Sequence, residues 1–140
     1  YWNSKSRGLI TGLTRDSDWR DLVRATIESV AYQTSDLFLS MRKDGLNPKS
    51  VKVDGGMVSN NWFVQFLSEI LKIKITRSKI NETTALGAAY MAGYQTGIYR
   101  SLSDIKQNWK KDRDFKPKFN KSYRNKLLQG WQQAIKKTLA

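Results

Sequence analysis

The sequence predicts an α/β domain that is rich in helix and carries a short, partly parallel sheet. Apolar or small residues recur at i, i+3 and i+4 spacing from Trp19 to Met41, which predicts one long amphipathic helix of about seven turns. Further along, an alternating strand at 51–54, a helix at 60–71 and a second strand at 73–76 follow one another closely. A strand, helix and strand of these lengths are typical of a parallel crossover unit.

The long helix has start and stop signals at its two ends. Before it, residues 1–15 hold scattered apolar side chains between glycines, which predicts a loop or a ragged edge strand. Asp16, Ser17 and Asp18 then supply an N-cap with acid in the first turn. Gly45 ends the helix after two basic residues, and a proline shortly beyond it prevents continuation.

Paired glycines lie between the first strand and the following helix. The stretch VKVDGGMVSNN (51–61) runs from the strand into Gly55 and Gly56, and then into a helix that begins at Ser59 or Asn60. Residues without side chains let a ligand lie against backbone N–H groups, and a helix N-terminus favours phosphate. The stretch matches neither a GxxxxGK[ST] loop nor a GxGxxG fingerprint. An ordinary tight turn is the alternative interpretation.

The next helix has an unusual composition. It begins at Glu82 or Thr83 and places alanines and glycines at i, i+3, i+4 and i+7. Gly87 in mid-helix costs about 1 kcal/mol relative to alanine, so a compensating reason is needed. A close helix crossing or tight packing in a core would each supply it, and the residues leave both open.

The C-terminal part is basic. Residues 100–140 carry 12 Lys and Arg against three Asp, a net charge of +9. The elements predicted there are a short helix from Ser101 or Ser103 to Trp109, a loop at 110–121 and a final helix from Tyr123. The predicted organisation is a loop or edge strand at 1–15, a helical and strand–helix–strand–helix core at 16–99, and a basic helical tail at 100–140.

Aromatic residues interleave with cations in this tail, as they do in single-strand nucleic-acid binders. A solvated, lysine-rich surface with aromatic side chains anchoring the core explains the same pattern without a recognition motif. We therefore do not expect nucleic acid as the partner, although a basic nucleic-acid-binding module is one alternative function.

Composition excludes several kinds of chemistry. The chain has 140 residues, a formal net charge of +13, and neither cysteine nor histidine. Disulfides, Cys/His zinc sites, thiol nucleophiles and imidazole bases are excluded, so catalysis would need carboxylates or a bound metal. The apolar runs are far shorter than the roughly 20 residues that span a bilayer, which favours a cytoplasmic protein without a membrane partner. Tyr1, in place of an initiator methionine, indicates a chain that begins inside a longer reading frame or has been processed.

Several motifs together resemble one known family. Over nearly its whole length the chain resembles the C-terminal part of the glycerol kinases, within the FGGY family of carbohydrate kinases. The resemblance implies part of the second lobe of the actin-like ATPase (ribonuclease H-like) fold. The matching stretches are RGLITGLTR (7–15), RATIESVAYQTSD (24–36), VDGGMVSNNWFVQF (53–66), ETTALGAAYMAG (82–93) and the tail YRNKLLQGWQQAIKK (123–137).

The resemblance implies that ATP or ADP binds at the paired glycines. Carried over by position, the nucleotide-binding residues are Gly55, Gly56 and Asn60. A β-carbon at Gly56 would take up the space of the ligand, and the Asn60 amide can donate and accept hydrogen bonds. The Mg²⁺ that accompanies ATP would be held by the phosphates and by groups outside this chain.

The resemblance assigns no catalytic or metal-binding residue to this chain. The phosphate-binding loop, the glycerol contacts and the aspartate general base of the family all lie upstream of the matching region. Asp54 is expected to support the turn, and Glu28 and Gln33 to have structural roles within the long helix. We expect an ATP/ADP-binding portion of a kinase that converts ATP and glycerol to ADP and glycerol 3-phosphate, incomplete as a catalyst by itself.

The resemblance also bears on partners. The helix that contains ALGAA (85–89) is expected to pack at the hinge between two lobes. Close packing there would compensate for the cost of a glycine at position 87 in mid-helix. The expected partner besides nucleotide is the missing N-terminal kinase lobe, or a second copy of the chain. A degenerate remnant, without function, is another alternative. The stretch matching a regulated region of some relatives, 115–126, departs strongly from them, so no regulatory partner is implied.

Overall fold

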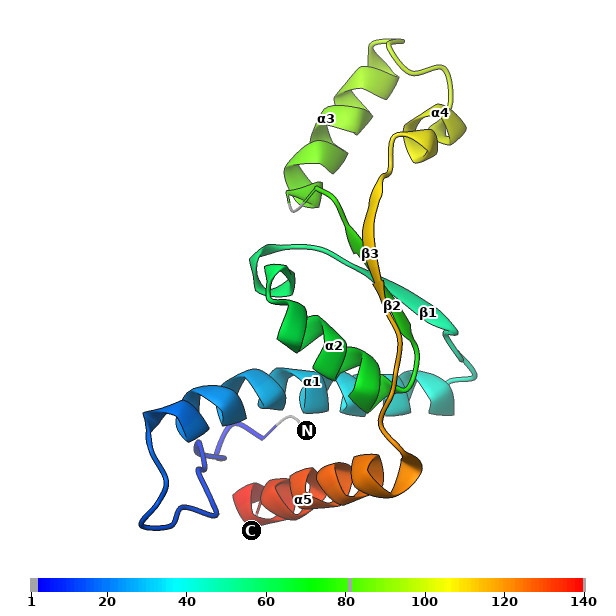
Figure 1. Cartoon of the computed structure of the whole chain (residues 1–140). Coiled ribbons are helices and arrows are strands. Elements are labelled where there is room, and N and C mark those ends of the chain that lie inside the picture. The colour runs from blue at the N-terminus through cyan, green and yellow to red at the C-terminus, as the bar shows by residue number, and fades with distance from the viewer. Residues whose placement is uncertain (1–2, 81, 140) are drawn as a thin grey trace.

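The computed structural model describes residues 3–80 and 82–139 (Figure 1). In this part of the chain, helices alternate with three short strands. The elements are α1 (Trp19–Lys43), β1 (Ser50–Val53), the 3₁₀-helix η1 (Gly56–Ser59), α2 (Asn61–Leu71), β2 (Lys74–Ser78), α3 (Thr83–Gln95), α4 (Leu102–Gln107), β3 (Lys111–Phe115) and α5 (Lys121–Leu139). Residues 3–15 form a loop and no strand, one of the two predicted alternatives.

The sheet is mixed, with the strand order β1-β2-β3. The predicted parallel crossover is confirmed, because β1 and β2 pair in parallel and α2 connects them along the chain. The predicted loop at 110–121 is wrong for residues 111–115, which form β3 and pair antiparallel with β2, whereas residues 116–120 do form a loop. The charged residues of β3 form an edge strand through cross-strand pairs: Thr76 Oγ1 donates to Asp114 Oδ1 at 2.7 Å, and Arg77 binds Asp112.

Both ends of α1 follow the predicted signals. Asp18 is the N-cap and forms a capping box with Asp21. At the other end Gly45 has φ 86°, and its N–H donates to Arg42 O at 3.1 Å while Leu46 N–H donates to Met41 O at 2.9 Å. This pair of bonds is a Schellman motif, which requires a residue that tolerates a left-handed conformation.

The core lies between the sheet, α1, α2 and α5. Val64 and Ile70 on α2, Ala31 on α1 and Ile75 on β2 are each fully buried. The predicted apolar stripe of α1 is only partly buried, because Trp19 is 67% exposed and Leu37 59% exposed. The stripe packs against the core from Ile27 onward, and its first two turns lie outside that contact.

α3 and α4 form an arm that projects from the sheet (Figure 1). Within α3 the buried residue is Gly93, where an added β-carbon would lie 2.8 Å from Tyr99 Cε2. At Gly87 an added β-carbon meets no atom of the described residues within 4 Å. Among the described residues, none therefore approaches Gly87 closely, whereas Tyr99 approaches Gly93.

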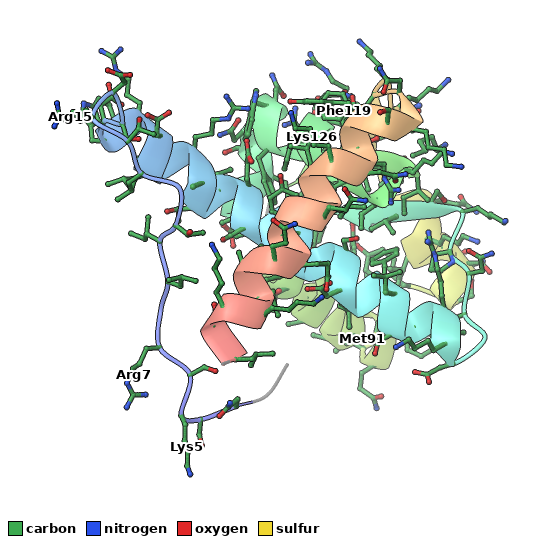
Figure 2. All side chains as sticks on the ribbon, turned by 90° about the horizontal axis from the view of Figure 1, so that it is seen from below. Lys5, Arg7, Arg15, Met91, Phe119 and Lys126 are labelled. Atoms are coloured by element: carbon green, nitrogen blue, oxygen red, sulfur yellow. The ribbon has the colours of Figure 1, made fainter. Side chains whose placement is uncertain are left out.

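The basic C-terminal part packs against the core through β3 and α5. Figure 2 shows α5 lying across α1, with the extended N-terminal segment beside its end. Phe115 is buried, Trp131 stacks on Tyr32 with ring centroids 5.4 Å apart, and Phe119 contacts Phe66 edge-on at 6.4 Å. These aromatic side chains anchor the tail to the core, as the alternative to nucleic-acid binding predicted. Among the described residues, no helix is long and apolar enough to cross a lipid bilayer.

Candidate functional site

The loop that follows β1 begins at a glycine with an unusual backbone conformation. Gly55 has φ 94° and ψ 174° and occupies the N-cap position of η1. Only glycine adopts this region of backbone space without strain. The turn therefore depends on Gly55 for its shape, and it lies at the carboxyl end of a parallel strand, where α/β sheets bind ligands.

Gly56 opens η1 and is exposed. A β-carbon built on Gly56 meets no atom of residues 3–80 and 82–139 within 4 Å. Nothing in the described residues therefore excludes a side chain at this position. Together with Gly55, it presents two consecutive residues of bare backbone, which suits close approach by a flat or anionic ligand.

Asn60 joins η1 to α2 and caps the second helix. Its Oδ1 accepts hydrogen bonds from Trp62 N at 3.0 Å and Phe63 N at 3.2 Å. The cap therefore satisfies two N–H groups of the α2 N-terminus, and the 3₁₀-helix η1, which begins at Gly56, precedes it. The predicted start of this helix at Ser59 or Asn60 is confirmed, because Asn60 is its N-cap and α2 begins at Asn61. Because Oδ1 is engaged, Asn60 can offer a ligand the N–H donors of its amide nitrogen.

The four carbonyl groups of η1 all accept hydrogen bonds. Ser59 Oγ donates to Gly56 O at 2.7 Å, and Asn60 N donates to Met57 O at 3.3 Å. The carbonyls of residues 58 and 59 accept from the Arg77 side chain on β2. Each carbonyl of η1 therefore has a partner within the protein. Sequence reasoning missed Arg77, because no local pattern marks it.

A surface cavity of about 380 Å³ adjoins Asn60. It opens between the first turns of α1 and α2, and Trp62 forms part of its wall while stacking on Phe66 at 5.2 Å. The Arg24 guanidinium lies 5.9 Å from the centre of the Trp62 ring. The lining residues are Trp19, Arg20, Val23, Arg24, Ile27, Asn60 and Trp62.

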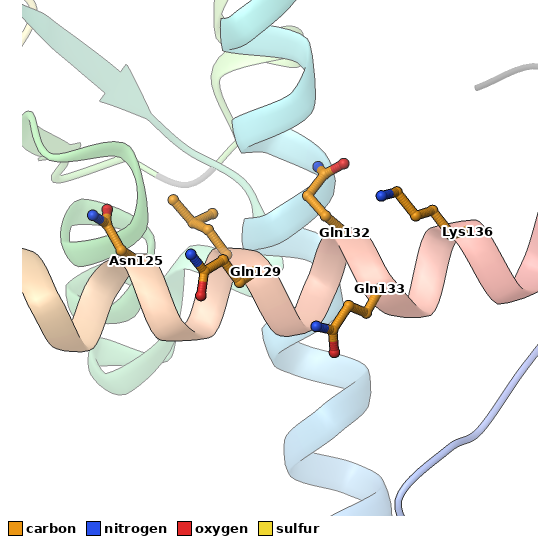
Figure 3. Close-up of a pocket in the computed structure, with 6 residues that line it drawn as sticks. Asn125, Gln129, Gln132, Gln133 and Lys136 are labelled. Carbon is orange, nitrogen blue, oxygen red and sulfur yellow. The ribbon is translucent and has the colours of Figure 1, made fainter.

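Other cavities lie on α5, away from the predicted site residues. Figure 3 shows one of about 350 Å³, lined mostly by amide side chains such as Asn125 and Gln129 and by Lys136. A larger one, of about 870 Å³, lies between α1 and α5 and includes Asp36, which accepts from Trp131 Nε1 at 2.7 Å. Neither contains a predicted nucleotide contact.

Glu28 is engaged in a structural network, as expected. Its carboxylate accepts from Arg24 Nε at 2.7 Å and from Tyr32 Oη at 3.2 Å. The hydrogen bond and charge of Glu28 raise the pKa of Arg24, and burial followed by the nearby Glu28 charge raises the pKa of Tyr32. Both groups therefore keep their protons at neutral pH, and the network holds Tyr32 in the core. Asp54 and Gln33 are exposed.

Comparison with known proteins gives a consistent result. The model of the FGGY family of carbohydrate kinases, C-terminal domain, matches residues 1–96. Glycerol kinase 1 of Pseudomonas aeruginosa is 48% identical over 137 residues, which cover 98% of this chain and 28% of that protein. Glycerol kinase of Marinomonas sp. is 50% identical over 135 residues, covering 96% of this chain and 27% of that protein.

Solved structures agree with this comparison. The crystal structure of Plasmodium falciparum glycerol kinase with ADP has a TM-score of 0.85 and 36% identity, and covers 99% of this chain and 28% of that chain. Ligand-bound xylulose kinase from Lactobacillus acidophilus has a TM-score of 0.71 at 23% identity. At this identity the similarity supports the fold and no shared function. The predicted actin-like ATPase fold is confirmed, and the chain spans about 28% of the length of the first curated relatives it matches.

Proposed function

Because the chain belongs to the FGGY family of carbohydrate kinases, where it corresponds to the C-terminal domain, we propose that it is the nucleotide-binding portion of a glycerol kinase. The complete enzyme would transfer the γ-phosphoryl group of ATP to glycerol and release ADP and glycerol 3-phosphate. The observation that carries this proposal is the exposed loop in which Gly55 and Gly56 stand one helical turn before Asn60, at the carboxyl end of β1.

In this proposal the loop holds ADP or ATP through backbone and amide groups. The ligand lies over Gly56, where no β-carbon stands in its way, and Gly55 gives the turn its shape. Asn60 donates from its amide nitrogen to the nucleotide. Residues 3–80 and 82–139 contain no group of three acidic, His or Cys side chains that could hold a metal ion. Magnesium would therefore arrive with the phosphates, and we assign no step through it.

In this proposal, the acceptor side of the reaction lies in the part of the kinase that this chain does not match. We propose that the chain works against the remaining, N-terminal part of the kinase, with self-association as the competing arrangement. The exposed first turns of α1, with Trp19 and Val23, and the small-residue face around Gly87 support this proposal. Closure of the two parts would exclude water from the transferring phosphoryl group. A kinase that draws on ATP is expected in the cytoplasm.

Calorimetric titration of the purified chain with Mg-ADP tests the proposal. The variant Gly56→Trp places an indole over the loop and should abolish binding. Gly8→Trp is the matched control, because an added side chain at Gly8 also meets nothing within 4 Å and lies in the N-terminal loop. We expect saturable binding by the parent and by Gly8→Trp.

The outcomes separate binding from folding. Circular dichroism of all three proteins reports whether the substitutions disturb the helices. A folded Gly56→Trp variant that binds Mg-ADP as well as the parent would refute the placement of the nucleotide. We further expect the purified chain to leave glycerol unphosphorylated in a coupled ADP-release assay, because it carries neither the general base nor the glycerol contacts of the family.

A further inference from the structure

We infer that Arg77 is a positioning residue for the nucleotide loop and that Asp112 orients its guanidinium. The inference rests on the proposed function, since it concerns how Gly56 and Asn60 are presented to a nucleotide. It adds to the site a residue from β2 and another from β3, two strands that lie outside the glycine motif.

The register of the sheet brings Arg77 to the loop. Arg77 is the penultimate residue of β2 and is the Cα partner of Val53, the last residue of β1. The loop starts directly after Val53, so the Arg77 side chain originates beside its first residue. Parallel strands end at the same edge of a sheet, and this edge is where ligands of α/β domains bind.

The guanidinium holds the end of η1. Nη1 donates to Val58 O at 2.7 Å and to Ser59 O at 3.3 Å. The last carbonyls of a helical turn have no partner within the turn, and they carry partial negative charge. A cation that donates to both of them fixes the point at which η1 ends and Asn60 begins.

Asp112 fixes the other edge of the same group. Its Oδ2 accepts from Arg77 Nε at 2.7 Å and lies 2.6 Å from Nη2. The Phe115 ring lies 5.4 Å from the guanidinium carbon, and the Arg77 side chain is only 12% exposed. Because guanidinium is planar and rigid, a carboxylate on one edge determines where the remaining N–H groups point.

The contacts explain why this arginine would affect nucleotide affinity. Val58 and Ser59 lie between Gly56 and Asn60, so the residues that Arg77 holds are those that set the spacing of the two proposed contacts. Lysine cannot reproduce the arrangement, since one ammonium group cannot span Asp112 and both carbonyls with fixed geometry. Without the guanidinium, the carbonyls of Val58 and Ser59 would lose the side chain that ties them to β2, so we expect the end of η1 to be held less firmly.

The experiment compares Arg77→Met, Arg77→Lys, Asp112→Asn and the double variant Arg77→Met/Asp112→Asn in the whole chain. Arg113→Met is the matched control, because it removes one cation from an exposed position of the adjoining strand. Mg-ADP affinity is measured by calorimetry, and amide hydrogen exchange of residues 57–60 is measured without nucleotide. Unfolding midpoints show whether each variant is folded.

We expect Arg77→Met to weaken Mg-ADP binding about tenfold or more, the usual effect of losing hydrogen bonds to a charged group. Arg77→Lys should recover part of that loss, and Asp112→Asn should lose less than Arg77→Met. The double variant should resemble Arg77→Met, because Asp112 acts through Arg77. Exchange at residues 57–60 should accelerate in Arg77→Met while the interior amides of α2 stay protected.

The results distinguish this inference from the proposed function. If the parent binds no Mg-ADP, the proposed function fails for the isolated chain, and the exchange rates alone decide whether Arg77 holds the loop. If Arg77→Met is unfolded, the Mg-ADP affinity and amide exchange of Asp112→Asn decide whether the inference holds, because that variant retains the Arg77 cation. Arg77→Met that is folded and has unchanged exchange and affinity, or a control that weakens binding equally, would overturn the inference.

Discussion

The indole of Trp131 on α5 lies nearly parallel to the ring of Tyr32 on α1, with the centroids 5.4 Å apart and the planes inclined by 18°. The indole N–H donates to Asp36 Oδ2 at 2.7 Å. Trp131 therefore joins α5 to α1 through both an apolar contact and a hydrogen bond.

We expect Trp131→Ala to lower the free energy of unfolding by about 3 kcal/mol, because it removes a large ring from the contact between the helices. Trp131→Phe keeps a ring but loses the N–H donor, and should cost about 1 kcal/mol. Urea denaturation followed by circular dichroism measures both. Equal losses in the two variants would show that the hydrogen bond, and not the stacking, holds α5.

A buried carboxylate fixes the turn between β3 and α5. Glu69 on α2 is 3% exposed, and its Oε2 accepts from Lys118 N at 2.6 Å and Phe119 N at 2.7 Å. Glu69→Gln replaces a charged acceptor by an amide that can present a donor to these N–H groups. We expect a loss of about 2 kcal/mol in the free energy of unfolding.

Glu82→Gln is the control for this change, because Glu82 is exposed and its side chain caps no helix. Thermal unfolding of both variants beside the parent gives the comparison. A similar shift in the two midpoints would mean that loss of a negative charge, rather than of the Glu69 contacts, is responsible.

The two glycines of the loop should respond differently to alanine. Gly55→Ala forces a β-carbon into a conformation with φ 94° and should lower the free energy of unfolding by about 1–3 kcal/mol. Gly56→Ala meets no atom within 4 Å and should leave stability nearly unchanged. Thermal melts test both, and a stable Gly55→Ala protein would show that the turn can take another conformation.

Acid should weaken the pairing of β2 with β3. The hydrogen bond from Thr76 Oγ1, and then that from Lys111, hold the pKa of Asp114 below its ordinary value. A carboxyl group with a lowered folded-state pKa stabilises the fold above its unfolded pKa, and this stabilisation is lost as the pH falls through the folded pKa. The loss should therefore begin below about pH 4.

The variant Asp114→Asn should flatten that part of the stability profile. Urea midpoints measured from pH 6 down to pH 3 give the slopes for parent and variant. Identical slopes would exclude Asp114 as a contributor to acid sensitivity.

The sequence was informative wherever neighbouring residues determine the structure. The ends of α1 could be predicted because Asp18 and Gly45 act on their own helix, and the parallel crossover follows from periodicity and length. β3 could not be predicted, because its residues 111–114 are all charged and resemble a solvated loop. Their partners on β2 lie more than thirty residues earlier, and only the folded sheet pairs them.

The same distinction holds in the candidate site: residues within one motif could be predicted, and residues brought there by strand pairing could not. Gly55, Gly56 and Asn60 stand together in one short motif, so spacing and resemblance pointed to them. The cap that Asn60 forms, and the intervening turn of 3₁₀-helix, depend on side-chain geometry that spacing does not encode. Arg77 and Asp112 reach the site through pairing between strands, and they lie too far apart along the sequence for a local motif to contain both of them and the loop.

The arm formed by α3 and α4 affects which part of the molecule unfolds first. It leaves the sheet at the end of β2 and returns at the start of β3 (Figure 1), and Gly93 is its one buried residue among those described in α3 and α4. A unit with so little buried surface unfolds locally at a small free-energy cost, while α1, α2 and the strands stay folded. We therefore expect the arm to unfold as a separate unit, so that global denaturation midpoints report on the core rather than on the helix that carries Gly87.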